Sequence, residues 1–169
     1  MFRPMRRHKQ ALSMQECEEI LTKAQSGVLS VIGDDGYPYG VPVNHVYESG
    51  KIAFHCASSG HKLDAIKNND KVSYCVIWKD DVSAERQATD FISVIVFGRA
   101  KIVEDDDGKR RICEAIGQKF APDYMKACRD ETEMYLQRGG LTCIEIDIEH
   151  MTGKCGLYVM QERNKGEAE

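Results

Sequence analysis

The segment Phe54-His55-Cys56-Ala57-Ser58-Ser59-Gly60-His61-Lys62-Leu63-Asp64-Ala65-Ile66 runs from a short apolar strand, through small residues, into a helix with two basic side chains in its first turn. The positive end of a helix dipole attracts acidic side chains, so cations there are mildly unfavourable. An anion such as a phosphate explains His61 and Lys62 if it also meets free backbone N–H groups and the hydroxyl of Ser58 or Ser59. The alternative is a solvated lysine beside an ordinary helix cap. These residues alone leave both interpretations open.

The composition is typical of a soluble globular protein. The chain has 169 residues, enough for one domain with a substantial core, and 42% of them are hydrophobic and 30% charged. There are 23 Lys and Arg against 27 Asp and Glu, with no basic stripe, which argues against nucleic acid as the main partner. Neither a bilayer-spanning apolar run nor a secretory signal is present. We therefore expect a cytoplasmic protein with neither a nucleic-acid nor a membrane partner.

The seven cysteines are odd in number and include no CxxC pair, which indicates reduced thiols and not a disulfide framework or a zinc site. The spacing of His45, His55, Cys56 and His61 matches no standard metal-ligand set, and strand alternation sends His55 and Cys56 to opposite faces. We therefore expect no metal. Cys56 is either a nucleophile beside a histidine or inert packing. Trp78 is either a stacking platform or a core or dimer contact.

The order of the predicted elements favours an antiparallel fold. Strands follow one another through hairpin turns, without the regular strand–helix alternation of a parallel sheet. We predict strands at about 27–33, 37–47, 51–56, 72–78, 91–103 and 141–149, and helices at about 14–25, 59–69, 109–120 and 123–138. A polar link covers 79–89 and a turn covers 105–108. The fold class is mainly β with flanking helices (α+β), as a small closed or partly open β-barrel.

Two finer expectations follow from the strand patterns. Pro38 and Pro42 confine their strand to an edge or a bulge, and a two-residue loop at Ser49-Gly50 pairs Glu48 with Lys51 and places Asn44 opposite His55. A three-residue loop would shift this register. The strand at 141–149 alternates cleanly, so we expect its acidic face, Glu145, Asp147 and Glu149, to be solvated.

Several nucleotide and catalytic templates fail. No GxGxxG follows a strand, Gly60-His61-Lys62 lacks the other residues of a P-loop, and no GxSxG elbow occurs. The remaining prediction is a phosphate-bearing ligand at the 55–62 turn, beside the strand Val41-Pro42-Val43-Asn44. A proline in that strand leaves unpaired backbone groups on its neighbour, and such groups can meet the edge of a flat heterocycle.

Three segments together resemble one protein family. Gly40-Val41-Pro42-Val43-Asn44, followed by residues 52–66, resembles the pyridoxamine 5'-phosphate oxidase-related flavoproteins, in particular their nitroimidazole-resistance (Nim-like) branch. Residues 91–100 resemble a later barrel strand of that branch, and Glu149-His150-Met151-Thr152-Gly153-Lys154 resembles its C-terminal strand. The likeness covers most of residues 5–158, and its specificity lies in the order and spacing of the motifs.

The resemblance implies a fold, a cofactor and a set of contacts. The fold would be a Greek-key, FMN-binding split β-barrel over residues 1–169, with an N-terminal arm at 1–12 and a polar tail at 159–169. It would form a homodimer with two FMN molecules at the interface. The implied FMN phosphate contacts are His61, Lys62, Ser59 and Gly60, and the implied isoalloxazine contacts are Val41, Pro42, Val43, Asn44, His55, Cys56 and Ala57. Lys154 would reach the flavin or its phosphate from the second subunit, and no catalytic residue is assigned. His61 stands where pyridoxamine oxidases carry Arg, which implies a weaker and pH-sensitive contact.

The function implied is an FMN-dependent oxidoreductase that reduces a small aromatic acceptor, such as a nitro compound, by two electrons. Its donor would be transiently bound NADH or NADPH, since no dinucleotide motif is present. True pyridoxamine phosphate oxidation is an alternative, but Gly153-Lys154-Cys155-Gly156-Leu157-Tyr158 does not reproduce the Arg- and His-containing segment of those enzymes. A non-catalytic flavin-binding module, redox-sensing through Cys56, and haem binding are further alternatives.

Overall fold

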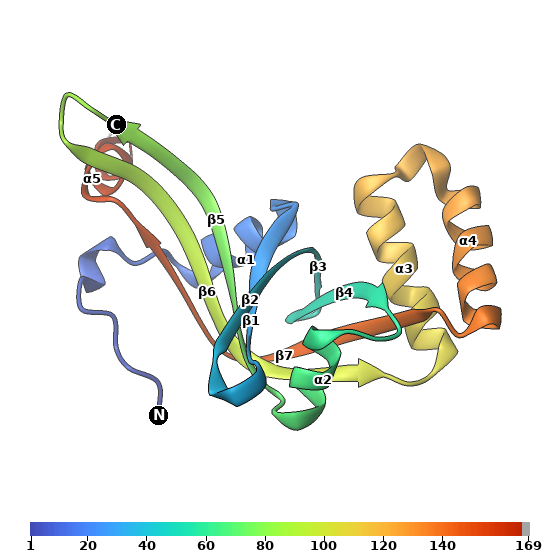
Figure 1. Cartoon of the computed structure of the whole chain (residues 1–169). Helices are drawn as coiled ribbons and strands as arrows, with labels where there is room; N and C mark the ends of the chain where they lie inside the picture. The colour runs from blue at the N-terminus through green and yellow to red at the C-terminus, as the bar shows by residue number, and fades with distance from the viewer. Residues whose placement is uncertain (167–169) are drawn as a thin grey trace.

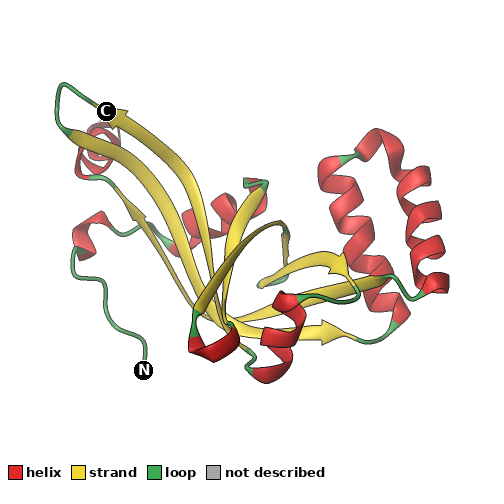
Figure 2. Ribbon diagram, in the orientation of Figure 1, coloured by secondary structure: helices red, strands yellow, loops and turns green. Residues whose placement is uncertain are grey.

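The computed structural model describes residues 1–166 and contains one seven-stranded antiparallel sheet flanked by helices. The strands lie in the order β2-β1-β5-β6-β7-β4-β3, so the sheet is open, with β2 and β3 at its two ends (Figures 1 and 2). The strands are β1 (Ser26–Ile32), β2 (Pro38–Asn44), β3 (Val46–Glu48), β4 (Lys51–Ala57), β5 (Lys71–Ser83), β6 (Ala88–Val103) and β7 (Leu141–Cys155). The predicted mainly-β, split-barrel type of fold is therefore confirmed.

The helices lie around this sheet. The α-helices are α1 (Met14–Lys23), α2 (His61–Asn68), α3 (Asp106–Phe120), α4 (Met125–Arg138) and α5 (Leu157–Gly166), and short 3-10 turns cover His8–Gln10, Asp34–Gly36 and Pro122–Tyr124. Helix α1 begins with the expected capping box, in which Ser13 and Glu16 satisfy each other's backbone N–H groups. Helices α3 and α4 form a hairpin beside β4 and the start of β7 (Figure 1). No helix among residues 1–166 is both long and apolar enough to cross a membrane.

Strands β6 and β7 bend together near Gly98. The register between them shifts there, so that Phe97 lies opposite His150 while Gly98 lies opposite Ile148, leaving Glu149 as the extra residue of a bulge. A Cβ atom at Gly98 would lie 2.3 Å from the carbonyl oxygen of Asp147, so only glycine fits. Beyond the bend, the first half of β7 pairs with β4. The bend therefore sets the position of β4, and of the α2 turn that follows it.

Two apolar cores stabilise the two sides of the sheet. The larger includes Leu21, Leu29, Phe54, Tyr74 and Ile144, all essentially inaccessible to solvent, and joins α1 and α2 to the inner face of the sheet. The smaller lies under α3 and contains Val46, Ala53, Val103, Ile112, Cys113 and Cys143. Strand β4 contributes to both cores, because its successive side chains point to opposite faces.

Several finer expectations fail, each for a physical reason. Strands β5 and β6 continue through the predicted polar link at 79–89 and pair as far as Ser83 and Ala88. This paired segment, the β5–β6 arm, extends past the core, so its residues have no core to face and lack an apolar pattern. Asp105 does not belong to a turn but caps α3, its carboxylate accepting a hydrogen bond of 2.7 Å from the Gly108 N–H. Of the predicted polar tail, residues 159–166 belong to α5, and residues 167–169 lie outside the described part.

The predicted register of the 48–51 hairpin is correct only near its turn. Glu48 does pair with Lys51, but the predicted strand at 37–47 divides at His45 into β2 and β3. Asn44 consequently pairs with Ser26 and His55 with Cys143, so the expected pairing of Asn44 with His55 is wrong. The prediction that Pro38 and Pro42 mark an edge strand is confirmed, because β2 ends the sheet.

The predicted solvation of the acidic face of β7 is wrong at Glu145. This residue is only 6% exposed, and its carboxylate meets the Nζ atoms of Lys51 and Lys101 at 3.2 and 3.3 Å and the guanidinium of Arg111. Burial alone would raise the pKa of Glu145, but hydrogen bonds from Arg111, Lys51 and Lys101 outweigh it and lower the pKa. Glu145 therefore remains ionised and joins β4, β6, β7 and α3.

His45 separates β2 from β3 because its side chain is drawn into the core. Its Nε2 lies 2.9 Å from the carbonyl oxygen of Leu21, and its Nδ1 lies 3.0 Å from the Tyr74 hydroxyl. A carbonyl only accepts, so Nε2 carries the proton, and Nδ1 faces the Tyr74 hydroxyl, which lies 3.0 Å from both Nδ1 and the carbonyl oxygen of Val43. Burial, reinforced by the charge of Lys119, lowers the pKa of His45 to about 4. His45 is therefore neutral in the folded protein.

We predict that His45 makes folding stability depend on pH between about 6.5 and 4. Above pH 6.5 the ring is neutral in both the folded and the unfolded chain. Between pH 6.5 and about 4, the unfolded chain binds a proton at His45 and the folded chain does not. Stability should fall by up to about 3 kcal/mol as the pH drops through this window. The variant His45→Gln, which cannot titrate, should be less stable at pH 7 and should lack this component in urea unfolding series. An exposed control, His8→Gln, should retain the wild-type slope. A slope unchanged in His45→Gln would contradict the assignment.

Candidate functional site

The turn between β4 and α2 forms an open helix N-terminus. Gly60 is the cap residue of α2, and no side chain caps the helix there. Its φ of 135° is a conformation that side-chain-bearing residues rarely adopt, and a Cβ built on it would meet nothing within 4 Å. The backbone N–H groups of the first turn are the groups that a helix leaves unsatisfied, and they carry the positive end of its dipole. The turn can therefore accept an anion.

His61 connects this turn to strand β2. Its ring stacks on that of Tyr39, with ring centroids 4.3 Å apart, and its Nε2 lies 3.7 Å from a carboxylate oxygen of Asp34. The Asp34 side chain is 88% exposed and therefore held only weakly. An anion bound at the α2 turn would compete with Asp34 for His61, so it would bind best with that carboxylate turned away.

Cys56 and Lys62 lie together on the inner side of the same turn. Cys56 packs against the larger core, and burial raises the pKa of its thiol, although the positive charge of Lys62 acts in the opposite direction. The thiol of Cys56 is therefore protonated at neutral pH. This favours the packing interpretation of Cys56 over the nucleophilic one. Lys62 is close enough for its charge to act on this thiol.

Strand β2 presents a free edge. Among residues 1–166 it pairs only with β1, so the backbone groups on its other side are outside the hydrogen-bonded ladder of the sheet. Val41 and Val43 turn inward against the larger core, whereas Pro42 and Asn44 are exposed. The stacking of Tyr39 on His61 places this strand beside the α2 turn. β2 can therefore offer backbone donors and acceptors to a flat ligand held at the turn.

His55 lies on the opposite side of β4 from Cys56, as strand alternation predicts. Its Nδ1 is 3.9 Å from the Sγ of Cys113 on α3. His55, Cys56 and Ala57 all line a cavity of about 550 Å³ between β4, α3 and α4, whose other lining residues include Cys113, Phe120, Glu131, Tyr135 and Leu141. The His55 ring thus lies beside α3, whereas the ring of His61 stacks on Tyr39 of β2.

Lys154 also lies apart from the α2 turn. It lies near the C-terminal end of β7, opposite Ser93 of β6, whereas β4 pairs with residues 141–147 at the beginning of β7. Its ammonium lies 5.6 Å from the centre of the Phe91 ring, and its backbone bridges to Ala11 of the N-terminal arm. A shared site for Lys154 and Lys62 therefore requires a second copy of the chain.

The sequence analysis missed one cluster of reactive side chains. Cys113 and Cys143 come together under α3, with their sulfur atoms 3.9 Å apart and His55 beside them. These residues are far apart in the chain, and no local motif marks their meeting. Within residues 1–166, no group of three or more His, Cys, Asp or Glu side chains is arranged to hold a metal ion.

The fold and this site define a class of split-barrel protein in which the uncapped N-terminus of a helix, here α2, follows a strand of the sheet. Comparison with protein families places the chain within that class, since the model of the family described as pyridoxamine 5'-phosphate oxidase matches residues 13–155. The chain therefore belongs to the pyridoxamine 5'-phosphate oxidase family. No curated protein sequence matches it significantly.

Solved structures share this fold. A candidate 5-nitroimidazole antibiotic resistance protein from Bacteroides thetaiotaomicron has a TM-score of 0.69 at 20% identity, with 86% of each chain covered. The flavocytochrome Anf3 from Azotobacter vinelandii has a TM-score of 0.73 at 20% identity, covering 90% of this chain and 72% of that one. An FAD-binding protein from Mesorhizobium loti has a TM-score of 0.57 at 25% identity, covering 86% of this chain and 96% of that one.

Proposed function

We propose that this protein is an FMN-binding oxidoreductase that reduces a small aromatic nitro compound by two electrons, with transiently bound NADH or NADPH as donor. The observation that carries the proposal is the uncapped N-terminus of α2, which follows β4 directly and has Lys62 in its first turn. Family membership supports a flavin cofactor, as do the similar structures of an FAD-binding protein and a flavocytochrome. The resemblance of residues 40–44 and 93–100 to the Nim-like branch supports the choice of acceptor.

The residues at the turn fit a phosphate. Gly60 leaves open space where any other residue would place a Cβ, so a phosphate can approach the backbone closely. The backbone N–H groups of His61 and Lys62 and the Lys62 ammonium are the donors, because the N–H groups of Leu63 and Asp64 already donate to the carbonyl of Gly60. The exposed hydroxyl of Ser59 is nearby in the chain. His61 would turn from Asp34 toward the anion. The free edge of β2 would offer its backbone groups to the ring system.

Bound FMN would supply hydride acceptance and two-electron transfer. In the overall reaction, a nitroarene, a reduced nicotinamide and a proton give a nitrosoarene, the oxidised nicotinamide and water. The chain's part is to hold the reactants and to place N–H donors and a cation where negative charge develops. The nicotinamide would bind only transiently, because the chain has no dinucleotide-binding motif.

An exposed apolar face supports the proposed homodimer. Ile77, Ile95 and Phe97 point outward from β5 and β6 and are 65%, 39% and 40% exposed. Phe2 of the N-terminal arm stacks on Phe97 and on His150, with ring centroids 5.5 and 4.7 Å apart. Exposed apolar faces of this kind are typical of protein–protein interfaces. A second copy on this face would also bring in the Lys154 contact that one chain cannot make.

We expect the protein loaded with FMN to show flavin absorption, to be bleached by NADH or NADPH, and to turn over a nitroimidazole or nitrobenzoate. Stopped-flow absorbance measures the reduction, and consumption of the nitro compound measures turnover. Retention of FMN without reduction or turnover would refute the enzyme and leave a flavin-binding module. Oxygen-dependent formation of pyridoxal phosphate would instead identify a pyridoxamine phosphate oxidase. A Soret band in the purified protein would identify haem.

We predict that Lys62→Ala weakens FMN binding about tenfold or more. A charge-assisted contact to phosphate contributes on the order of 1.5–3 kcal/mol, and 1.4 kcal/mol corresponds to a factor of ten. Titration followed by flavin fluorescence measures the dissociation constant. The matched control is Lys67→Ala, an exposed lysine in the last turn of the same helix, which should bind FMN as the wild type does. Equal affinities of Lys62→Ala and the wild type would place the phosphate elsewhere.

We also predict that Phe97→Glu disrupts the dimer. A carboxylate buried without a partner at the interface should shift the protein from dimer to monomer in analytical ultracentrifugation. The control Tyr124→Glu carries the same charge at a site that is 70% exposed and lies outside the β5–β6 face, so it should remain dimeric. A wild-type protein that sediments as a monomer at micromolar concentration would refute the proposed assembly.

A further inference from the structure

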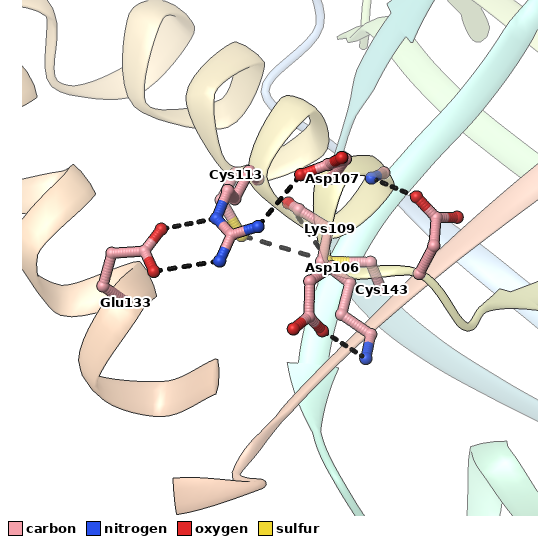
Figure 3. A network of polar contacts seen from close by, with 9 residues as sticks. Asp106, Asp107, Lys109, Cys113, Glu133 and Cys143 are labelled. Atoms are coloured by element: carbon pink, nitrogen blue, oxygen red, sulfur yellow. Dashed lines mark hydrogen bonds and ion pairs between the residues drawn. The ribbon is translucent and has the colours of Figure 1, made fainter. Parts of the chain in front are cut away.

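Cys113 and Cys143 form a close thiol pair beneath α3. Cys143 lies on β7 and is fully buried, and Cys113 lies on α3 and is 7% exposed. Their Sγ atoms are 3.9 Å apart (Figure 3), and the Cys143 thiol also faces the carbonyl oxygen of Lys109 at 3.9 Å. A disulfide needs about 2.05 Å between sulfur atoms, so bond formation requires the two sulfur atoms to move closer together.

The third member of the cluster is His55. It is the cross-strand partner of Cys143 in the β4–β7 ladder, and its Nδ1 lies 3.9 Å from the Sγ of Cys113. Cys113 therefore has a potential hydrogen-bond donor on each side, the thiol of Cys143 and the ring of His55. Buried cysteines in apolar surroundings are normally inert, and flanking donors of this kind are what make a thiolate accessible at neutral pH.

The protonation equilibria agree with this geometry. The hydrogen bond from Cys143 lowers the pKa of the Cys113 thiol, burial opposes it, and the contact with His55 lowers it further. The same contact with Cys113 raises the pKa of Cys143, and burial adds to the effect. The hydrogen bond to Cys113 also raises the pKa of His55. The pair consequently resembles one thiolate and one thiol that donates to it.

The cluster is open to small molecules through the cavity of about 550 Å³ between β4, α3 and α4. Both Cys113 and His55 line this cavity, whereas Cys143 does not. Ion pairs join the two helices of the hairpin. Arg110 on α3 meets Glu133 on α4 at 2.6 Å (Figure 3), and Arg129 on α4 pairs with Glu114 on α3. The cavity thus presents Cys113 to solvent and keeps Cys143 behind it.

We propose that Cys113 and Cys143 form a peroxide-reactive dithiol, in which Cys113 attacks a small hydroperoxide and Cys143 resolves the product to a disulfide. In the first step the Cys113 thiolate attacks the terminal peroxide oxygen and the O–O bond breaks. The leaving alkoxide or hydroxide takes a proton from Nδ1 of His55, and Cys113 becomes a sulfenic acid. In the second step the Cys143 sulfur displaces hydroxide from Cys113. The displaced hydroxide leaves as water with the thiol proton, and the S–S bond forms.

The overall reaction consumes two thiols and one hydroperoxide and gives one disulfide, one alcohol or water, and one further water. An external dithiol reverses it by thiol–disulfide exchange. This activity uses neither the α2 turn nor a flavin, so it is independent of the proposed oxidoreductase function. Cys75, by contrast, is a half-buried cysteine whose pKa is raised by burial. Within residues 1–166, no second thiol is hydrogen-bonded to it.

The test is stoichiometric oxidation of the reduced, full-length protein with one equivalent of hydrogen peroxide. We expect loss of two of the seven thiols, and a mass decrease of about two daltons that maps to a peptide joining Cys113 to Cys143 and is reversed by dithiothreitol. In Cys143→Ser the reaction should stop at a sulfenic acid on Cys113, trapped by dimedone. The matched control, Cys128→Ser, removes another thiol from the same cavity and should still form the disulfide.

A second measurement needs no substitution. At pH 7 iodoacetamide should alkylate Cys113 about ten times faster than Cys75, as peptide mapping over time would show, because a free thiol of ordinary pKa is only a few per cent thiolate there. A disulfide between other cysteines, or peroxide oxidation of Cys113→Ser at the wild-type rate, would overturn the proposal. Alkylation of Cys113 no faster than that of Cys75 would also overturn it.

Discussion

The close approach of β7 to Gly98 is the constraint on which the rest of this structure depends. At this point the carbonyl of Asp147 occupies the space that any side chain would need, and the register between β6 and β7 shifts by one residue. The shift redirects the beginning of β7 away from the long β5–β6 arm and makes it available to β4. Without that change of direction, β4 would have no partner beyond the short β3, and neither the α2 turn nor the α3–α4 hairpin would be fixed in place.

The charge distribution around β7 follows from the same arrangement. Glu145 lies where β4, β6 and β7 run side by side and α3 crosses, so cations from three elements converge on one carboxylate. An ionised group at such a position is stable only if it is paired and hydrogen-bonded, and here the partners come from Lys51, Lys101 and Arg111. The hydrogen bonds that lower the pKa of Glu145 in spite of burial thus also join the elements that surround the second core.

The sequence predicted what local chemistry determines. Strand and helix types, the capping box at Ser13, the edge position of β2 and the separation of His55 from Cys56 all follow from patterns within a few residues. The errors arise where distant segments meet. Glu145 looked solvated because its cationic partners lie on other elements, and His45 interrupted a predicted strand because Leu21 and Tyr74 bind its ring. The 79–89 arm was missed because it has no core to face, so its sequence carries no apolar pattern.

The pairing of Cys113 with Cys143 could not be predicted from the sequence, because it too joins distant segments of the chain. They are 30 positions apart in the sequence, with the end of α3 and all of α4 between them, and the β4–β7 ladder brings His55 and Cys143 side by side below α3. That ladder also explains how one short strand can serve two kinds of chemistry. Because consecutive residues of a strand face opposite ways, Cys56 lies toward Lys62 and the core while His55 lies toward the thiol pair. A change at β4 that shifted its register by one residue would exchange these two environments, so the pairing of β4 with β7 positions both sites at once.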